Sequence, residues 1–401
     1  MNELSSLGLI LLFALLAGHL VKFARVPEVT GYILAGVAVG PSVLGWVTHE
    51  NLAALEVFSE VALGLILFSI GTVFEFARVR AIGRVVLRIT LSESILAAAL
   101  VTLGALLLTQ DWRVALLLGA IAVETAAAST LMVIRECGAE GPLSESLIGI
   151  IGINNVLCLA AFYTVAAILD FQAHAGGMVL RMLYESAFPV VWQLVGSVAL
   201  GYLIGLLISS WATKVQEHGE VLILLTGCVL LCVGISLLLD MSPLVASLAV
   251  GATTVNLSQH SRRLFQVLSR SDPPFYAIFF VIAGADLDVS LLTTMGWLGV
   301  IYVIGRATGK FAGSRLGARR TALPERVKGL LGFGLMSQAG LAVGLALTIS
   351  RRFPDLAPVV VTVVLAAVAV NEMIGPLSAR LAIARSGESR PKALQAEAVA
   401  L

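Results

Sequence analysis

"GAIAVETAAASTLMVIRECG", residues 119–138, is an apolar stretch with one acid near its centre and a dense run of Gly, Ala, Ser and Thr. A second stretch of the same character, "GFGLMSQAGLAVGLALTIS", covers residues 332–350. Small residues at this density allow helices to cross closely or to unwind locally within a membrane. Each stretch lies in the middle of a triad of apolar segments, at about 86–170 and about 291–384. Such paired interruptions indicate inverted repeats around a site at mid-membrane, although tight packing of unbroken helices is the alternative.

The composition indicates a membrane protein. The chain has 401 residues, of which 58% are hydrophobic and 13% charged, whereas soluble domains carry about 25% charged residues. The charges lie in short clusters between apolar runs of about 20 residues, the length that crosses a hydrocarbon core. We therefore predict an all-α polytopic membrane protein with about thirteen transmembrane helices, near residues 5–23, 29–46, 53–76, 86–109, 113–136, 146–170, 189–212, 220–239, 242–257, 274–289, 291–313, 328–350 and 357–384.

The distribution of Lys and Arg over alternate loops predicts the orientation, because these residues are enriched in cytoplasmic loops. The opposite loops carry fewer of them, beside acids such as Asp111 and Asp170. We expect the N-terminus outside and the C-terminus in the cytoplasm. The cytoplasmic loops then contain Lys22, Arg25, Arg78, Arg80, Arg84, Arg135, Lys214, Arg262, Arg263, Arg270, Arg315, Arg319, Arg320, Arg326 and Lys328.

Other classes of function find little support in the sequence. No Ser/His/Asp, Cys/His or metal-ligand constellation indicates an enzyme or a metal site, and no cofactor is expected. No GxGxxG follows a predicted strand, so we expect no nucleotide-binding domain, and the net charge of +1 gives no reason to expect nucleic acid as a partner. The residues after 384 form a short polar tail that we expect to be disordered.

Charged residues within the predicted spans are the functional candidates, because a charge at bilayer depth is costly. Asp240, Asp286 and Asp288 lie near the ends of spans and are expected to face water. A lone acid within a span can also be a structural partner for a helix end or a buried Arg, and for Glu60 and Glu93 both interpretations stay open. The candidates are Glu60, Glu93, Glu124, Arg306, Lys310 and Glu372.

Five strings in this order make the chain resemble the monovalent cation:proton antiporters, in particular the cation:proton antiporter-2 branch. The resemblance extends from about residue 6 to residue 384. The strings are "VPEVTGYILAGVAVGPSVLG" (26–45), "FFVIAGADLD" (279–288), "GRATGKFAGSRLGAR" (305–319), "GLMSQAGLAVGLAL" (334–347) and "NEMIGP" (371–376).

The resemblance implies a transmembrane exchanger domain over residues 1–384, followed by a tail over 385–401. It also implies that two discontinuous helices cross at mid-membrane and that a mobile core moves against a fixed scaffold, as in an elevator. The core would be residues 86–170 and 291–384, the dimerisation scaffold 5–76 and 220–289, and the linker helix 189–212. The implied partners are a monovalent cation, a proton, the lipid bilayer and a second copy of the chain. The implied location is a bacterial-type inner membrane.

The resemblance also implies an ion site at Thr125, Asn154 and Asn155, with Arg306 as the basic residue of the eleventh span. Relatives have an aspartate where this chain has Asn155. An amide oxygen can bind Na⁺ or K⁺, but an amide does not exchange a proton, and an antiporter needs a group that does.

Another acid is therefore expected to titrate. Glu124 precedes Thr125, where relatives usually have a small or apolar residue, and we favour it as the titrating group, paired with Arg306. Glu372 of "VNEM" is the alternative, since this segment is the repeat-mate of "INNV". Glu93 and Gln338 are further candidates.

Three hypotheses follow. The chain exchanges Na⁺ or K⁺ for H⁺ by an elevator-like movement as a homodimer. Alternatively, it is a degenerate relative that acts as a regulatory subunit, or a cation uniporter or channel that needs no proton. The first is favoured by the presence of Thr125, Arg306 and "SQAG", and the second by the missing aspartate.

Overall fold

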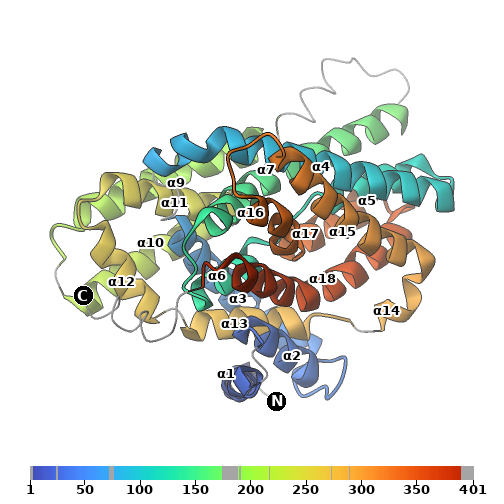
Figure 1. The fold of residues 1–401 in the computed structure, drawn as a ribbon. Helices are drawn as coiled ribbons and strands as arrows, with labels where there is room; N and C mark the ends of the chain where they lie inside the picture. The colour runs from blue at the N-terminus through green and yellow to red at the C-terminus, as the bar shows by residue number, and fades with distance from the viewer. Residues whose placement is uncertain are drawn as a thin grey trace.

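The structure, a computed structural model, contains helices and no strands among the residues that it describes, which are 3–23, 26–71, 76–173, 188, 191–215, 217–271, 273–288 and 290–389. Figure 1 shows the chain as a bundle of helices that cross one another at many angles. The elements are α1 (Glu3–Phe23), α2 (Glu28–Val39), α3 (His49–Gly71), α4 (Phe76–Thr109), α5 (Trp112–Ala122), α6 (Ala127–Glu136), α7 (Pro142–Ala173), η1 (Trp192–Gly196), α9 (Ser197–Trp211), α10 (His218–Leu238), α11 (Pro243–Leu257), α12 (Ser261–Ser271), α13 (Pro273–Ala285), α14 (Leu291–Thr294), α15 (Gly296–Ala318), α16 (Glu325–Leu330), η2 (Leu331–Leu335), α17 (Gly340–Arg352) and α18 (Ala357–Ser386).

Most of the predicted spans meet the requirements for crossing a bilayer. Within the described residues, eight helices are long and apolar enough, or nine if the bent pair 325–335 and 340–352 is counted as one span. The shorter apolar helices α2, α11 and α13 correspond to three further predicted spans. The predicted span at 291–313 corresponds to α15, which carries Arg306 and Lys310 within its length. The total of thirteen spans stays a prediction.

Both predicted interruptions are confirmed. The first lies between the end of α5 at Ala122 and the start of α6 at Ala127, and the second lies between η2 and α17, whose axes are bent by 43°. The two breaks meet, because the backbone N–H of Ala126 donates to the carbonyl of Ser337 at 3.0 Å. Two discontinuous helices therefore cross at one point, and their free backbone groups face each other there.

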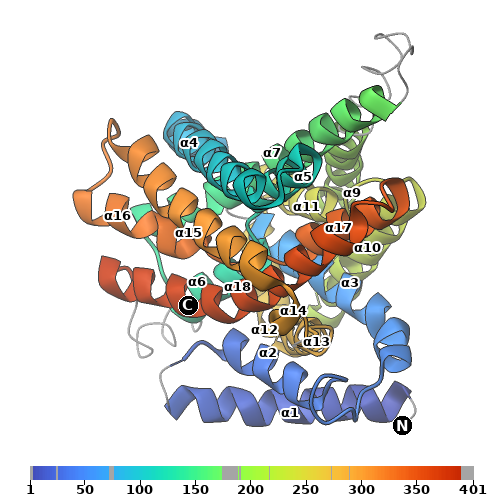
Figure 2. The ribbon, with the colours of Figure 1, turned by 90° about the vertical axis from the view of Figure 1, so that its right-hand side faces the viewer.

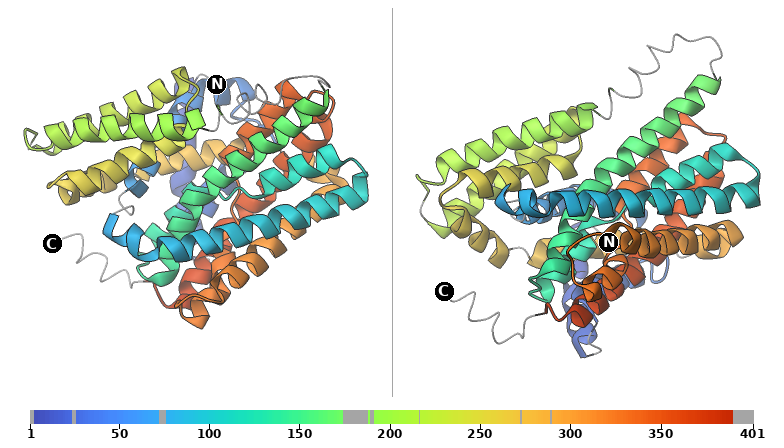
Figure 3. Two further views of the ribbon diagram at one scale, coloured as in Figure 1. Left: turned by 90° about the horizontal axis from the view of Figure 1, so that it is seen from above. Right: turned by 45° about the horizontal axis from the view of Figure 1, so that its top comes forward.

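The two triads run in opposite directions, as an inverted repeat requires. Figure 3 shows α4 and α15 side by side, and their contacts run antiparallel. A Cβ on Gly309 would lie 2.3 Å from the Cα of Ala97, and one on Gly313 would lie 2.5 Å from the Cα of Glu93. Glycine therefore allows the two backbones to approach until Lys310 and Glu93, on facing helices, can touch.

The remaining helices pack around these triads. Figure 2 shows α1 and α2 along one side of the molecule, beside α13. The helices α9, α10 and α11 share a separate apolar cluster with α3, centred on Leu65, Phe68 and Val250. The assignment of 5–76 and 220–289 to a scaffold, of 189–212 to a linker and of two other ranges to a core stays a prediction.

The structure bears on the ends of two predicted segments. Residues 189–190 lie outside the described part of the chain, and the helix there begins with a π-helical turn at Trp192. The start of the tail is ordered, because α18 continues to Ser386 and Glu388 accepts hydrogen bonds from the backbone N–H groups of Leu143 (2.7 Å) and Ser144 (2.9 Å). These contacts place an anion at the N-terminus of α7, where it is stabilised by the helix dipole. The rest of the tail, residues 390–401, lies outside the described residues.

Candidate ion-binding site

The two helix breaks leave backbone carbonyls without helical partners, and Arg306 binds three of them. Its guanidinium donates to the carbonyl oxygens of Met336 (2.7 Å), Glu124 (2.7 Å) and Ser337 (2.9 Å). These carbonyls belong to the C-terminal ends of α5 and η2, where the helix dipole favours a positive charge. Arg306 is fully buried. Its charge is thus stabilised by main-chain oxygens of both discontinuous helices.

The predicted pair between the side chains of Glu124 and Arg306 is therefore wrong. Arg306 contacts the main chain of Glu124, while the Glu124 carboxylate accepts a hydrogen bond from the backbone N–H of Ala339 at 3.3 Å. Ala339 immediately precedes α17, so the carboxylate lies at the positive end of that helix. The physical reason is that a helix break exposes both backbone carbonyls and backbone N–H groups. The cationic Arg306 binds the carbonyls, and the anionic Glu124 carboxylate binds an N–H group.

Lys310, rather than Arg306, forms a buried ion pair, and its partner is Glu93. Its Nζ lies 2.7 Å from Oε2 of Glu93, and both side chains are fully buried. Lys310 also donates to the carbonyl of Val123 (2.5 Å) and to Oγ1 of Thr125 (2.9 Å). Glu93 is therefore a partner of Lys310, and whether this acid also takes part in function stays a prediction.

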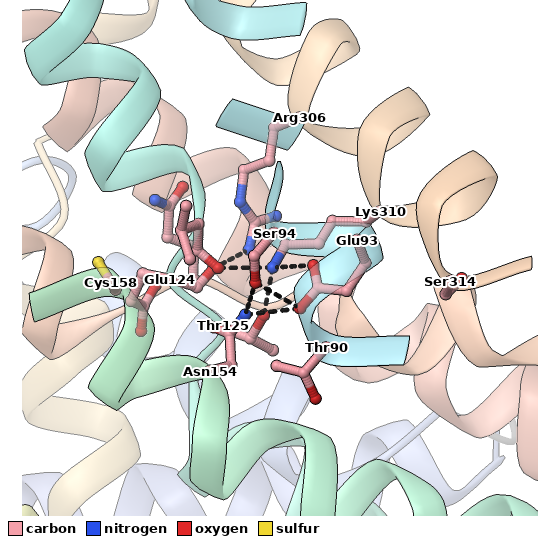
Figure 4. A network of polar contacts seen from close by, with 12 residues as sticks. Thr90, Glu93, Ser94, Glu124, Thr125, Asn154, Cys158, Arg306, Lys310 and Ser314 are labelled. Carbon is pink, nitrogen blue, oxygen red and sulfur yellow. Dashed lines mark hydrogen bonds and ion pairs between the residues drawn. The ribbon is translucent and has the colours of Figure 1, made fainter. Parts of the chain in front are cut away.

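Asn154 joins this ion pair, as Figure 4 shows. Its Nδ2 donates to Oε1 of Glu93 at 2.6 Å and to Oγ of Ser94 at 3.1 Å. The structure thus brings Thr125 and Asn154, two of the predicted site residues, to the same charged cluster. Side chains from α4, α7, α15 and the break between α5 and α6 meet in it.

A cavity of about 680 Å³ reaches the other side of the crossing. Glu124 and Asn155 both belong to its lining. The Oδ1 atom of Asn155 has no hydrogen-bond partner among the described residues, so it is free to accept one or to bind a cation. Of the three acids that are buried in the described part of the chain, Glu93, Glu124 and Glu372, Glu124 alone lines this cavity. Farther along the cavity wall lie the acids Glu56, Glu60 and Asp286.

Glu372 lies near the crossing but not in the cavity lining. Both of its carboxylate oxygens are within 2.9 Å of Oγ of Ser129, which lies in the first turn of α6. This arrangement parallels that of Glu124 at α17, because each acid lies at the N-terminal end of the second half of a broken helix.

Gln338 connects the two breaks. Its Nε2 donates to the carbonyl of Ile121 (3.2 Å) and to the hydroxyl of Tyr302 (2.8 Å), and its Oε1 accepts from Asn371 (3.0 Å). Both hydrogen-bonding ends of the amide are engaged, so the contacts indicate a role in holding the crossing together.

The reasoning from sequence missed the part that Lys310 plays. The signal was present, since Lys310 lies four residues after Arg306 and such spacing places both cations on one face of α15. The contributions of Ser94 and Ser129 could not be anticipated in this way, because single serines within apolar helices are common and carry no pattern.

A pair of crossing discontinuous helices, with charged side chains at the break and a cavity that reaches it, defines a secondary transporter. The sequence model of the transmembrane sodium/hydrogen exchanger family matches residues 8–378. The chain belongs to this family, and it is a multi-pass membrane protein. The predicted resemblance to cation:proton antiporters is confirmed.

Individual relatives extend over most of the chain. The ammonium/H⁺ antiporter subunit AmhT of Alkalihalophilus pseudofirmus is 24% identical over 350 residues, which is 86% of each chain. The Na⁺/H⁺-K⁺ antiporter GerN of Bacillus cereus is 22% identical over 348 residues, covering 85% of this chain and 86% of GerN. The sodium/proton antiporter MjNhaP1 of Methanocaldococcus jannaschii has a similar fold, with a TM-score of 0.70 at 16% identity over 96% of this chain and 97% of MjNhaP1.

Proposed function

We propose that the protein exchanges a monovalent cation for a proton, with Glu124 as the group that binds each in turn. The observation that carries this proposal is the position of Glu124, whose buried carboxylate lines the same cavity as the unpartnered amide oxygen of Asn155. A carboxylate can hold either a cation or a proton, and the neighbouring amide oxygen supplies a neutral ligand for the cation. Competition between the two for one carboxylate couples their movements.

The missing aspartate does not prevent this chemistry. Asn155 provides an oxygen but no charge, and Glu124 provides the charge from the discontinuous helix α5–α6. The other buried acids are less suited, because Glu93 is held by Lys310 and Glu372 by Ser129. The site would thus contain a carboxylate and a neutral oxygen, as a cation site requires. Its carboxylate would come from the break between α5 and α6 instead of from α7.

We propose an elevator-like movement, in which the core helices carry the site past the scaffold. The scaffold would stay in place because it binds the scaffold of a second copy of the chain. The cavity is lined by the early part of α3, the turn before α11 and residues after α13. In the predicted orientation, with the N-terminus outside an inner membrane, these segments lie on the outer side. The cavity would then open to the outside.

The names of the relatives guide the choice of cation. GerN is a Na⁺/H⁺-K⁺ antiporter and AmhT belongs to an ammonium/H⁺ antiporter. We propose Na⁺ or K⁺ as the substrate, since one carboxylate with neutral oxygens matches a single positive charge.

Reconstituted vesicles with an imposed pH gradient test the proposal. Addition of Na⁺, K⁺ or Li⁺ should dissipate the gradient with wild-type protein and fail to do so with Glu124→Gln. Glu60→Gln is the matched control, because Glu60 lines the same cavity from α3 and should leave exchange in place.

Two other results would replace the proposal. A folded wild-type protein that responds to none of the cations would favour a regulatory subunit. Cation uptake without proton movement, unchanged in Glu124→Gln, would favour a uniporter.

A further inference from the structure

We propose that Arg135 and Glu136, at the end of α6, are positioning residues that hold the core helices in the state in which the cavity is open. This inference rests on the elevator-like movement of the proposed function, but not on Glu124 as the titrating group. It is carried by three hydrogen bonds that cross the boundary between the predicted core and the predicted scaffold. They lie at the end of this boundary that is farther from the cavity.

The guanidinium of Arg135 binds two helices of the predicted scaffold at once. It donates to the hydroxyl of Tyr276 on α13 at 2.6 Å and to the hydroxyl of Ser69 on α3. Tyr276 and Ser69 are buried, whereas Arg135 itself is exposed. The donors of a guanidinium are fixed in a planar fork, so the two contacts together hold α6 in one position relative to both helices.

Glu136, the next residue, binds a third helix of the predicted scaffold. Its Oε2 accepts a hydrogen bond from the backbone N–H of Glu28, the first residue of α2, at 2.8 Å. A carboxylate at a helix N-terminus is favoured by the helix dipole. On the core side, Oε1 of Glu136 lies 3.7 Å from Nη1 of Arg380 on α18. Arg135 and Glu136 thus connect the core to α2, α3 and α13, and we call these two residues the latch.

Two of the helices that the latch binds also lead to the cavity. Glu60 of α3 lines the cavity, and Ser69, farther along the same helix, binds the latch. Asp286, directly after α13, lines the cavity, and Tyr276, near the start of α13, binds the latch. The latch and the cavity therefore lie at opposite ends of the boundary between core and scaffold.

Apolar side chains close this boundary between the latch and the cavity. A void of about 30 Å³ there is lined by side chains from both parts, which include Leu67 of α3, Leu248 of α11, Leu131 of α6, and Ile148 and Ile151 of α7. Such a void has room for about one or two water molecules, which is less than a hydrated ion occupies. An ion can leave on the latch side only after the core and the scaffold have separated there, and that separation breaks the latch.

The strength of the latch suits contacts that are broken in every cycle. A hydrogen bond in a protein shifts a two-state equilibrium by about 2- to 12-fold. A few such bonds favour the cavity-open state without making the other state inaccessible. Loss of the latch should therefore increase the fraction of molecules that open on the latch side.

Labelling of a cysteine in the apolar closure tests the latch without measuring exchange. In a background without the native cysteines, Ile148→Cys should react with an impermeant thiol reagent from the latch side only after the core has moved. Arg135→Ala should raise this rate by about 2- to 12-fold, and Glu136→Ala should change it in the same direction. Arg88→Ala is the matched control, because Arg88 is also exposed but donates to the carbonyl of Arg320 within the core. It should leave the rate unchanged.

The cation concentration for half-maximal exchange, measured from each face of oriented vesicles, provides a second readout. A shift away from the cavity-open state raises this concentration on the cavity side and lowers it on the latch side. Damage to the ion site or a general loss of packing would change both values in the same direction. Arg135→Lys keeps the charge but loses the forked donors, so it should give an intermediate shift.

The outcomes separate this inference from the proposed function. Unchanged labelling in both alanine variants of the latch, with exchange intact, would overturn the latch and leave the proposed function in place. Equal acceleration by Arg88→Ala would also overturn the latch, because loosening of the core alone would then expose position 148. Faster labelling with Arg135→Ala and Glu136→Ala, in a protein that exchanges no cation, would support the latch and overturn the proposed function.

Discussion

Nη2 of Arg306 lies 2.7 Å from the backbone oxygen of Glu124, whereas the carboxylate of Glu124 accepts from the backbone of Ala339. The hydrogen bond between the two residues is thus made by the main chain of Glu124 and not by its carboxylate. Arg306 holds the crossing together, and the Glu124 side chain is left for the cavity. A basic side chain at bilayer depth is stabilised here by carbonyl dipoles of helix ends rather than by a single acid.

Two double-mutant cycles distinguish these modes of contact. Glu93→Gln alone should lower the free energy of unfolding by about 3–5 kcal/mol, because it leaves Lys310 buried without its counter-charge. The double variant Glu93→Gln/Lys310→Met should recover part of this loss, with a coupling of about 0.5–3 kcal/mol. Thermal unfolding in detergent measures both.

The second cycle combines Glu124→Gln with Arg306→Gln. Glutamine keeps the backbone carbonyl that Arg306 binds, so we expect a smaller coupling between these two substitutions than between those at Glu93 and Lys310. A strong coupling in this cycle, together with none between Glu93 and Lys310, would show that Arg306 forms the ion pair, with Glu124 as its partner.

Close packing of α4 and α15 predicts a large effect from one methyl group. Gly309→Ala would place a Cβ 2.3 Å from the Cα and 2.6 Å from the N of Ala97. The helices must separate, so we expect a loss of at least about 1–3 kcal/mol and a weaker contact between Lys310 and Glu93.

Gly227→Ala is the control for this substitution, because a Cβ there meets no atom within 4 Å. It should be neutral or slightly stabilising, since Ala favours a helix over Gly. Equal unfolding temperatures for the two alanine variants would contradict the packing of α4 on α15.

Asn155→Asp should restore cation-dependent proton movement to Glu124→Gln. Both side chains line one cavity, so an aspartate at 155 returns a titrating carboxylate to the place where Glu124 acts. The pH-gradient measurement with vesicles compares the rescued variant with Glu124→Gln alone. Asn154→Asp serves as the control, because Asn154 faces Glu93 behind the cavity and should not rescue.

The broken helices could be predicted from sequence because their cause is local. The stretches 119–138 and 332–350 are rich in small residues at equivalent places of two triads, and that pattern survives in the fold. The positions of Glu124 and Asn155 at one cavity could not be derived in this way. They depend on how the helices α5 and α7 rotate about their axes, and this rotation is fixed by packing between segments far apart in the sequence.

The wrong pairing of Arg306 has a similar origin. Counting charges within spans treats side chains as the only partners, so the search for a counter-ion led to Glu124. Once the helices are known to break and cross, four carbonyls become available within reach of α15. The choice between acid and carbonyl therefore depends on where the helices end, which sequence patterns define only to within a few residues.

The predicted orientation can be tested with two single cysteines in a background without the four native ones. Arg319→Cys, after α15, should react with an impermeant thiol reagent from the cytoplasmic side alone. Glu56→Cys lies at the exposed part of the cavity wall and should react from the outside. Labelling of position 319 from the outside would reverse the orientation and place the cavity on the cytoplasmic face.

Proton release on cation binding tests the central claim most directly. Purified protein in weakly buffered detergent solution is titrated with Na⁺ or K⁺ near the pH of half-maximal transport, and the protons released per bound cation are counted from a pH indicator. We expect release that approaches one proton per cation as the pH falls, and no release from Glu124→Gln. Undiminished release from a folded Glu124→Gln protein would contradict the assignment of Glu124 as the group that exchanges a cation for a proton.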